Sequence, residues 1–378
     1  MRIAHVTDVY LPRLGGIELQ VRDLATRQRA AGHDPLVLTT TAGPVRPDDS
    51  GDPPVLRLGR EVGIGPYRVL RDRALRDVLA AQQVEAVHVH VSAFSPLGWT
   101  TARVAAAEGL PTVVSVHSMW HDIVPLVRRY ARWHAAADWP VVWAAVSTAA
   151  ATAVRDALDG APVAVLPNGI EPADWLTPAQ RGTADVPTFI SVMRMVRRKR
   201  PRELLHALLD LHAADPGRFR AVLVGDGPLL PALRRELAAA GTGTGIRLTG
   251  ALDRATIRTL LATSDVYLAP APRESFGIAA LEARSAGLPV IARAGSGVAD
   301  FILHGVEGWL VHSDDDLRDA AAALLGAPDR LAAVARHNRA VPPRVRWQTV
   351  LESADALYAT AARRHGSLPR TRVLAGAL

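Results

Sequence analysis

Residues 266–282 read VYLAPAPRESFGIAALE, and this stretch decides the fold. An apolar run at 266–269 predicts a strand, two prolines predict a loop, and an Ala/Leu pattern from Ile278 predicts a helix. Ser275, Phe276 and Gly277 then place backbone N–H groups at a helix N-terminus, where the helix dipole favours an anion. The stretch therefore predicts an α/β fold with an anion-binding loop after one strand.

The two carboxylates that bound the second half of this stretch are Glu274 and Glu282. Eight helical residues correspond to a rise of about 12 Å. The carboxyl groups of a retaining glycosidase lie only about 5 Å apart, so this pair does not fit that chemistry. It suits two contacts with an extended ligand, and the alternative is a helix-capping acid and a surface glutamate.

Short apolar strands alternate with Ala/Leu-rich helical patterns along the whole chain, which predicts parallel sheets covered on both faces. We predict strands at residues 3–6, 36–39, 55–58, 86–91, 112–116, 141–146, 163–166, 188–192, 221–224, 246–249, 266–269, 289–292 and 308–311. The alternation restarts after a Pro/Thr/Ala/Gly-rich stretch. The sequence therefore predicts two doubly wound, Rossmann-like domains, 1–172 and 188–343, joined by a linker at 173–187 and facing a central cleft.

The end of the chain, residues 344–378, is predicted as a long amphipathic helix packed across both domains, followed by a basic tail. Nine arginines stand between residues 330 and 378 against Glu352 and Asp355, whereas the net charge of the whole chain is +7. The first half is nearly neutral, so a nucleic-acid-binding function loses its support. The tail is either a solvated helix or a contact with an anionic membrane surface.

The composition is that of a globular protein: 378 residues, 49% hydrophobic and 21% charged. The absence of cysteine excludes disulfides, thiolate metal sites and a cysteine nucleophile. The N-terminus lacks the apolar core of a secretion signal, and no window reads as a membrane span. We therefore expect a cytoplasmic protein, and peripheral contact with the inner face of a membrane stays open.

Basic residues crowd residues 194–202, and Lys199 is the single lysine of the chain. Because arginine replaces lysine everywhere else, this position is a candidate for needing a compact ammonium group. The alternative is that Lys199 is a solvated surface residue that arginine has by chance not replaced.

Two glycine-rich turns follow predicted strands. Gly15 and Gly16 open a helix, so their backbone can approach a phosphate or a sugar oxygen, although a plain tight turn is the alternative. The run Gly225-Asp226-Gly227-Pro228 lacks the last glycine of a dinucleotide fingerprint, because Leu230 stands there. We interpret Gly227 as a tight turn.

Histidines and aromatic residues gather in the first half. His117 ends the strand at 112–116, on the edge that faces the predicted cleft, and His88 and His90 share one face of a strand. No Asp-x-Asp or His-Glu-x-x-His motif is present, so a metal site is not expected. The segment 127–133, VRRYARW, fits either a membrane interface or aromatics of a core or acceptor pocket.

Over nearly its whole length the chain resembles the GT-B-fold retaining glycosyltransferases of family 4 (glycosyl transferases group 1). The matching residues are Gly15-Gly16-Ile17-Glu18, Gly32-His33, His117, Val146-Ser147, Pro167-Asn168-Gly169-Ile170, Arg194, Lys199, Val224–Pro228, Glu274–Glu282 and Ala286–Val290.

The resemblance implies a role for each matching position. Arg194 and Lys199 would bind the diphosphate of a nucleotide sugar, Glu282 would hold the ribose, and His117 would border the transferred sugar. The implied catalytic residues are His117, Arg194, Lys199 and Glu274. The implied donor-binding residues are Gly16, Arg194, Lys199, Gly225, Glu274, Ser275, Phe276, Gly277, Ile278 and Glu282. The acceptor-side candidates are Asp8, Gly15, Glu18, His90, Trp120 and Asn168.

The implied function is transfer of a hexosyl unit from a UDP- or GDP-sugar, with retention and without a cofactor or metal. The acceptor stays open among a lipid, a glycan and a small cyclitol or other metabolite. An epimerase or hydrolase on the same plan is one alternative. Others are a non-catalytic sugar-nucleotide or membrane-surface binding protein and, less well supported, an NAD-dependent oxidoreductase.

Overall fold

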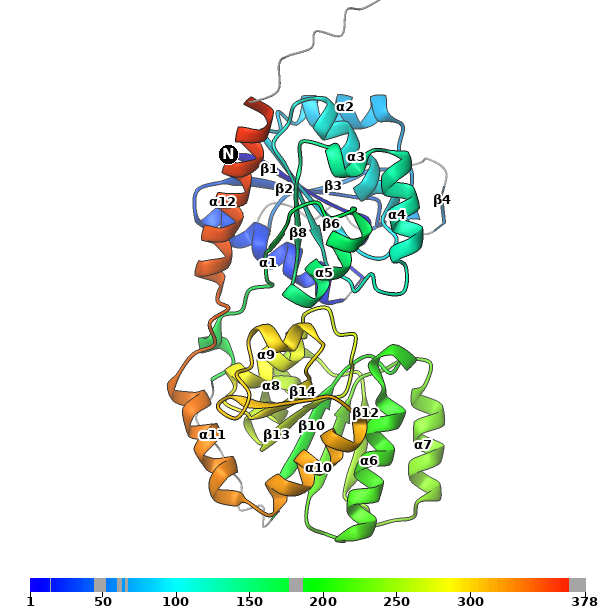
Figure 1. Ribbon diagram of the computed structural model, residues 1–378, viewed down its shortest axis with the longest axis vertical. Helices are drawn as coiled ribbons and strands as arrows, with labels where there is room; N and C mark the ends of the chain where they lie inside the picture. Colours follow the sequence, from blue (N-terminus) through cyan, green and yellow to red (C-terminus); the bar gives the residue numbers. More distant parts are fainter. Residues whose placement is uncertain (14, 44–51, 60–62, 65–66, 177–185, 367–378) are drawn as a thin grey trace, which may run out of the picture. The chain divides into compact units, whose positions relative to one another are not determined.

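Two compact units make up the structure, a computed structural model that describes residues 1–13, 15–43, 52–59, 63–64, 67–176 and 186–366 (Figure 1). The first unit comprises Met1–Val146, Ala150–Pro167 and Trp347–Leu378, and the second comprises Ser147–Ala149 and Asn168–Arg346. The chain enters the second unit at residue 168, slightly before the predicted boundary at 172. Residues 177–185 of the predicted linker and residues 367–378 of the basic tail lie outside the described part.

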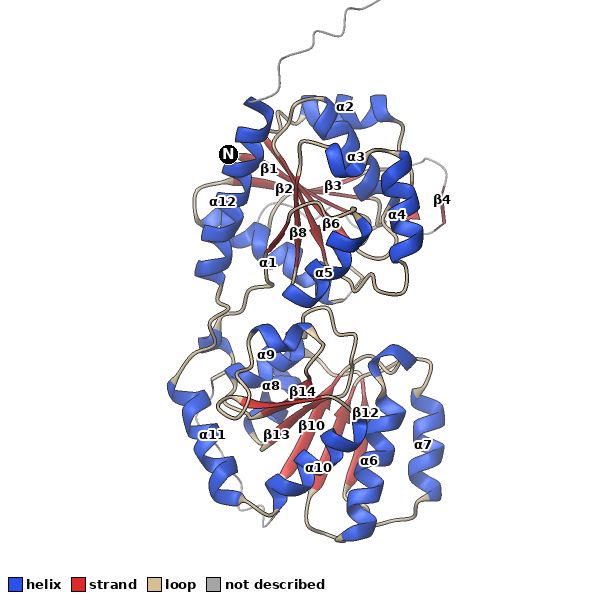
Figure 2. Cartoon of the chain, in the orientation of Figure 1, coloured by secondary structure: helices blue, strands red, loops and turns tan. Residues whose placement is uncertain are grey.

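Figure 2 shows the first unit as strands (red) with helices (blue) around them. The described strands of its parallel sheet run in the order β3-β2-β1-β6-β7-β8-β9. These strands are β1 (Arg2–Thr7), β2 (Asp34–Thr39), β3 (Val55–Arg57), β6 (Ala86–Val91), β7 (Thr112–Val116), β8 (Val142–Ala145) and β9 (Val163–Val165). A separate antiparallel pair joins β4 (Gly63–Ile64) and β5 (Tyr67–Arg68). Strands such as β6 are buried along their whole length, as expected of a sheet covered on both faces.

Helices cover both faces of this sheet. They are α1 (Gly16–Ala30), α2 (Asp72–Ala81), α3 (Pro96–Ala107), α4 (Val124–Trp133), α5 (Thr148–Ala157) and α12 (Trp347–Gly366). Helix α12 contacts α1, β7 and β8, so it belongs to the first unit. Its buried residues, including Trp347, Val350 and Tyr358, serve the first unit's core, and packing of this helix across both domains stays a prediction.

The second unit repeats this plan with a parallel sheet in the order β12-β11-β10-β13-β14-β15. The strands are β10 (Thr188–Val192), β11 (Arg220–Val224), β12 (Ile246–Gly250), β13 (Val266–Ala269), β14 (Val290–Arg293) and β15 (Gly308–Val311). The helices are α6 (Pro201–Ala214), α7 (Leu230–Ala239), α8 (Arg254–Ala262), α9 (Ile278–Ser285), α10 (Asp314–Leu325) and α11 (Pro328–Ala340).

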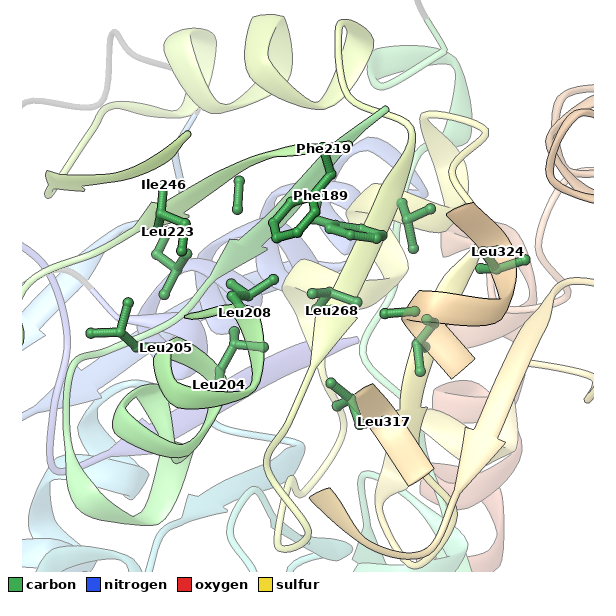
Figure 3. Close-up of a cluster of buried hydrophobic side chains, with 14 of the residues drawn as sticks. Phe189, Leu204, Leu205, Leu208, Phe219, Leu223, Ile246, Leu268, Leu317 and Leu324 are labelled. Atoms are coloured by element: carbon green, nitrogen blue, oxygen red, sulfur yellow. The ribbon is translucent and has the colours of Figure 1, made fainter. Parts of the chain in front are cut away.

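A buried apolar cluster holds the second unit together (Figure 3). Leu204, Leu205 and Leu208 of α6 pack onto Phe189 and Leu223 of the sheet. Fully burying a side chain of this size stabilises the fold by roughly 1.5–3 kcal/mol. Helix α10 is fixed in turn by a capping box, in which the Ser313 side chain accepts from the Asp316 N–H and the Asp316 carboxylate accepts from the Ser313 N–H.

Both sheets reverse their strand order at one place. In the first unit the order turns between β1 and β6, and in the second it turns between β10 and β13. In open parallel sheets the loops at the carboxyl ends of two such strands diverge and leave a crevice for a ligand. Each unit therefore offers one switch point at which the residues singled out by the sequence can meet a ligand.

A helix needs about 20 predominantly apolar residues to span a lipid bilayer. None of the described helices is both long enough and apolar enough to do so.

Candidate functional site

The switch point of the second unit carries the strongest sequence candidates. Arg194 and Lys199 lie in the loop that follows β10, and Lys199 ends a 3-10 turn, η4 (Arg197–Lys199). Glu274 lies in the loop that follows β13, just before α9. The two loops that flank the reversal of strand order therefore bring together residues 75 positions apart.

Lys199 and Glu274 form a direct ion pair between Nζ and Oε2, and both side chains are 20% exposed. An ion pair open to solvent contributes at most about 1 kcal/mol. The ammonium has three donors, so it can bind an anion as well as the carboxylate. Lys199 is thus a cation that Glu274 holds in place at the carboxyl edge of the sheet.

The backbone around Arg194 is fixed by the neighbouring loop. The N–H of Met193 donates to the carbonyl of Val224 at 3.0 Å, and the N–H of Met195 donates to that of Asp226 at 2.9 Å. Gly225 has a φ of +136°, and a Cβ there would overlap the carbonyl oxygen of Met193. Gly225 was predicted to bind the donor, but in the structure it permits this close approach of two backbones, while the Arg194 side chain is exposed.

The N-terminus of α9 lies beside the same loops. Gly277 adopts the left-handed conformation (φ +93°) directly before Ile278, the first residue of the helix. Phe276 is buried against Phe301, so only its backbone can serve a ligand. The carbonyl of Glu274 accepts from Gly297 N–H at 2.8 Å, which anchors the loop. Ser275, Phe276 and Gly277 thus present a helix N-terminus suited to an anion.

Glu282 lies one turn into α9, half-buried, with Arg254 Nη2 4.0 Å from its carboxylate.

The sequence did not reveal the role of Tyr267 of β13, whose hydroxyl donates to the carbonyl of Val192 at 2.9 Å and so holds the end of β10. Desolvation raises the pKa of Tyr267, which keeps the hydroxyl a donor. Tyr267 lies within an apolar strand pattern, which gives no sign of this hydrogen bond.

The acidic run 314–316 forms the first turn of α10 and also makes ion pairs with other elements. Asp314 pairs with Arg200 and, at 2.7 Å, with Arg293 at the end of β14. The hydrogen bond to Asp314 is the main cause of a raised pKa at Arg200. Arg200 is therefore occupied in joining the Lys199 loop to α10.

The switch point of the first unit has a different character. Asp8, after β1, accepts from the N–H groups of Leu97 (3.0 Å) and Gly98 (3.2 Å) and so caps α3. Burial raises the pKa of Asp8 to about 7. Asp8, predicted on the acceptor side, is thus a buried cap of α3 in this structure.

The glycine turn of the first unit does lie at the carboxyl edge. Gly15 is the N-cap residue of α1 and Gly16 its exposed first residue. Glu18 is buried, with Arg13 Nε 3.7 Å from its carboxylate. The Glu18 carboxylate also lies directly beside Gly15, so a ligand at the exposed start of α1 would meet this carboxylate as well as the backbone.

His117 follows β7 and is half-buried at the same edge. Its Nε2 lies 3.0 Å from Nδ1 of His90, and burial lowers the pKa of His117 to about 4. His90 is 3% exposed, so it supports His117 and does not meet an acceptor directly.

Two further residues predicted on the acceptor side, Trp120 and Asn168, are buried in this structure. Trp120 is fully buried, stacks on Trp99 and donates from Nε1 to the carbonyl of Ser92 at 3.2 Å, so it belongs to the core. Asn168 is buried and falls in the second unit. Sequence patterns cannot separate core tryptophans from pocket tryptophans, because both lie among apolar residues.

Two family models match the chain in succession. "Glycosyltransferase Family 4" matches residues 14–174, and "Glycosyl transferases group 1" matches residues 177–340. The chain belongs to the GT-B-fold glycosyltransferases. The resemblance to this family and the predicted α/β fold with two Rossmann-like domains are confirmed.

Similar proteins align with this glycosyltransferase over most of its length. The GDP-mannose-dependent alpha-(1-6)-phosphatidylinositol monomannoside mannosyltransferase of Mycobacterium tuberculosis is 27% identical, over 92% of this chain and 96% of the relative. Glycogen synthase of the same organism is 25% identical, over 99% of this chain and 98% of the relative.

Solved structures share the fold. Anabaena HepE in complex with UDP-glucose matches with a TM-score of 0.73 and 20% identity, covering 95% of this chain and 100% of that one. WaaG, a glycosyltransferase involved in lipopolysaccharide biosynthesis, matches with a TM-score of 0.65 and 18% identity, covering 96% and 98%.

Proposed function

We propose that this glycosyltransferase moves a hexosyl unit from a UDP- or GDP-sugar to an acceptor with retention of anomeric configuration. The observation that carries the proposal is the meeting of Lys199, Glu274 and the start of α9 at the β10/β13 switch point. Arg194 lies on the same loop as Lys199 and is exposed. This set of groups has the charge and position to bind a diphosphate.

The chemistry follows from where charge develops. As the anomeric C–O bond breaks, negative charge grows on the diphosphate, and fixed cations stabilise that charge more than they stabilise the ground state. Lys199 supplies an ammonium and Arg194 a guanidinium, while the N–H groups at the start of α9 bind phosphate oxygens. Glu274 holds Lys199 in place and can accept from a sugar hydroxyl.

Retention is proposed to occur by front-face attack, with no protein nucleophile and no metal. In this scheme the acceptor hydroxyl approaches the face that the diphosphate leaves, so the leaving group can take up the proton. Lys199 and Arg194 replace the cation that a metal-dependent enzyme would use. Glu282 is assigned to the ribose hydroxyls and His117 to the transferred sugar.

Two nucleotides, UDP and GDP, are candidates for the donor, and experiment decides between them. The mycobacterial mannosyltransferase is named for GDP-mannose and HepE was solved with UDP-glucose, so both classes of donor have precedents among similar proteins. The contacts assigned above involve the diphosphate, ribose and sugar, which the two classes share.

The test is a thermal-shift titration with UDP and GDP, each with EDTA and with Mg²⁺. A ligand at 100 times its Kd stabilises the native state by about 2.7 kcal/mol. We expect one diphosphate to stabilise the chain equally in EDTA and Mg²⁺. The matching UDP- or GDP-sugar series is then offered with acceptors, and the anomeric configuration of the product is read by NMR. An inverted product would refute retention, and stabilisation by neither nucleotide would refute the donor site.

A specific surface favours a lipid acceptor. On α4, Leu126, Tyr130 and Trp133 follow one another at helical spacing and are 69%, 38% and 78% exposed. Arg129 is also exposed, and it lies between them on the same stripe. Exposed apolar and aromatic side chains flanked by arginine suit the interface of an anionic bilayer. We propose that this stripe docks the first unit on such a surface.

Flotation with vesicles of phosphatidylcholine, alone or with phosphatidylserine, tests the docking. Binding should require the anionic lipid, weaken with salt, and be lost in a Leu126→Ser/Trp133→Ser variant. Val69→Ser, which replaces another exposed apolar residue on the same unit, is the matched control and should still float. Unchanged flotation of the double variant would disprove docking through α4.

A further inference from the structure

Four histidines line one face of the first unit's sheet. His5 of β1 is paired in register with His88 of β6, and His90 and His117 continue toward the carboxyl edge. His5, His88 and His90 are 0%, 0% and 3% exposed, and His117 is half-buried. Side chains alternate between faces along a strand, so this spacing places all four rings on the face that α1 and α12 cover.

The rings form a continuous chain of hydrogen bonds. His117 Nε2 lies 3.0 Å from His90 Nδ1, and His90 Nε2 lies 3.0 Å from His5 Nδ1. His5 Nε2 lies 2.6 Å from Oε1 of Gln28 on α1. Gln28 Nε2 donates to the Tyr358 hydroxyl of α12 at 2.9 Å. A side chain at the sheet edge is thus linked to the last helix of the chain.

Burial gives all hydrogen bonds between the histidines the same donor-to-acceptor direction. It lowers the pKa of His5 to about 4 and that of His90 well below its usual range, so both rings are neutral near pH 7. A neutral imidazole has one N–H donor and one acceptor nitrogen. Each bond therefore dictates the next, and only two arrangements satisfy the whole chain, with all protons pointing one way or all the other.

The Gln28 amide selects between the two arrangements. Its Nε2 faces Tyr358, so its Oε1 must accept from Nε2–H of His5. Nδ1 of His5 then accepts from His90 Nε2–H, and Nδ1 of His90 accepts from His117 Nε2–H. His117 is left with Nδ1 as an acceptor at the carboxyl edge.

A branch from Tyr358 is compatible with this direction. The hydroxyl accepts from Gln28 and keeps one proton, which can be donated to His88 Nδ1 at 2.8 Å, and His88 Nε2 then donates to Ser115 Oγ at 2.8 Å. The ring nitrogens of His5, His88 and His90 come close enough to hold a metal ion. However, every one of them has a hydrogen-bond partner, so the structure favours the hydrogen-bonded chain over a metal site.

We propose that Tyr358 and Gln28, acting through His5 and His90, fix His117 in the Nε2–H tautomer, so that its Nδ1 accepts a hydrogen bond from a ligand hydroxyl. Tyr358, Gln28, His5 and His90 are positioning residues, and the named hydrogen bonds are their means of action. The predicted tautomer of His117 does not depend on which reaction the protein catalyses. Only the ligand, a sugar hydroxyl, rests on the proposed function.

The decisive measurement is a long-range ¹H–¹⁵N correlation spectrum of the full chain, labelled with ¹⁵N-histidine, at pH 7.5 without ligand. His117→Gln assigns the His117 signals. The proposal requires a protonated Nε2 and an unprotonated Nδ1 at His117. A protonated Nδ1, a charged ring or an averaged pattern would overturn it, whether or not the chain transfers sugars.

Two variants test the selecting role of α1 and α12. Gln28→Met removes the amide and Tyr358→Phe removes the hydroxyl, so each should convert the His117 signal to a mixture of tautomers. With a working donor, each should also lower kcat/KM by roughly tenfold, the size of one neutral hydrogen bond. His33→Gln is the matched control, because His33 contacts Asp355 of α12 at 3.3 Å outside the histidine chain. It should leave the tautomer unchanged, and a pure Nε2–H signal in both folded test variants would refute the selection.

Discussion

The two units share one strand order but equip their switch points differently. In the second unit the loops after β10 and β13 carry a partly exposed ion pair, Lys199 with Glu274. In the first unit the corresponding loops and strands carry a buried capping carboxyl, Asp8, and a chain of neutral histidines. The fold fixes where a ligand can bind, and the side chains fix which chemistry the place can serve.

The difference has a physical basis. A diphosphate needs cations, and a cation keeps its charge most easily when water still reaches it. A sugar hydroxyl needs a neutral acceptor, and burial keeps an imidazole neutral. The second unit thus offers partly exposed cations to a charged ligand, and the first unit offers a neutral acceptor to uncharged hydroxyl groups.

The largest effect should come from removing the cation of the second unit. Lys199→Ala should lower kcat by about 10²–10³, or roughly 3–4 kcal/mol of transition-state stabilisation. Turnover is measured with an identified donor. Arg202→Ala is the control, because Arg202 pairs with Glu236 on the surface and should be dispensable. Near-native turnover of Lys199→Ala would show that the leaving group is stabilised elsewhere.

A smaller effect, on stability, should follow from filling the space at Gly225. Gly225→Ala combines a positive φ with overlap on Met193, which together should cost about 3 kcal/mol of unfolding free energy. Gly241 also has a positive φ, +95°, but open space around it, so Gly241→Ala should cost only about 1 kcal/mol. Denaturant unfolding of the two variants gives the comparison, and equal losses would mean that the β11 loop does not support Arg194.

The smallest effect per step of the experiment, about 1.4 kcal/mol per pH unit for one histidine, should appear as a pH dependence of the first unit. Burial lowers the pKa of His5 and of His117 to about 4. Between pH 6.5 and 4 the unfolded chain therefore binds more protons than the folded chain, so stability falls as pH falls. Each such histidine contributes about 1.4 kcal/mol per pH unit in that window.

Asp8 acts in the opposite sense. Its folded pKa of about 7 means that the folded chain holds a proton which the unfolded chain releases between pH 4 and 7, so this group stabilises the fold on acidification. Asp8→Asn should therefore steepen the acid loss, and His5→Gln should flatten it. Unfolding at pH 7.5, 6 and 5 gives the slopes, and a slope unchanged in both variants would contradict buried neutral histidines.

Much of the fold was predictable from the sequence. Each strand predicted from an apolar run has a counterpart in the structure, often with the same bounds, as at Thr188–Val192 and Gly308–Val311. The reason is that strands buried on both faces are continuous apolar runs. The β4–β5 pair was missed because strands of two residues carry no periodic signal.

The candidate site was less evenly predictable. Lys199 and Glu274 were found because a rare residue and a helix start are visible locally. The partners of Asp8, His90 and Trp120 were not visible, since they come from α3, β1 and α3, far along the chain. Burial by distant segments decides whether such a residue meets a ligand or the core, and local patterns do not contain that information.

The placement of α12 has a consequence for synthesis. The second unit is almost continuous in sequence, from Asn168 to Arg346, whereas the first unit needs Trp347–Gly366 to complete one face. On a translating ribosome the second unit can close before the first one does. The first unit is completed by Tyr358, so the amide of Gln28 acquires its partner only after residues 168–346 of the second unit have been made.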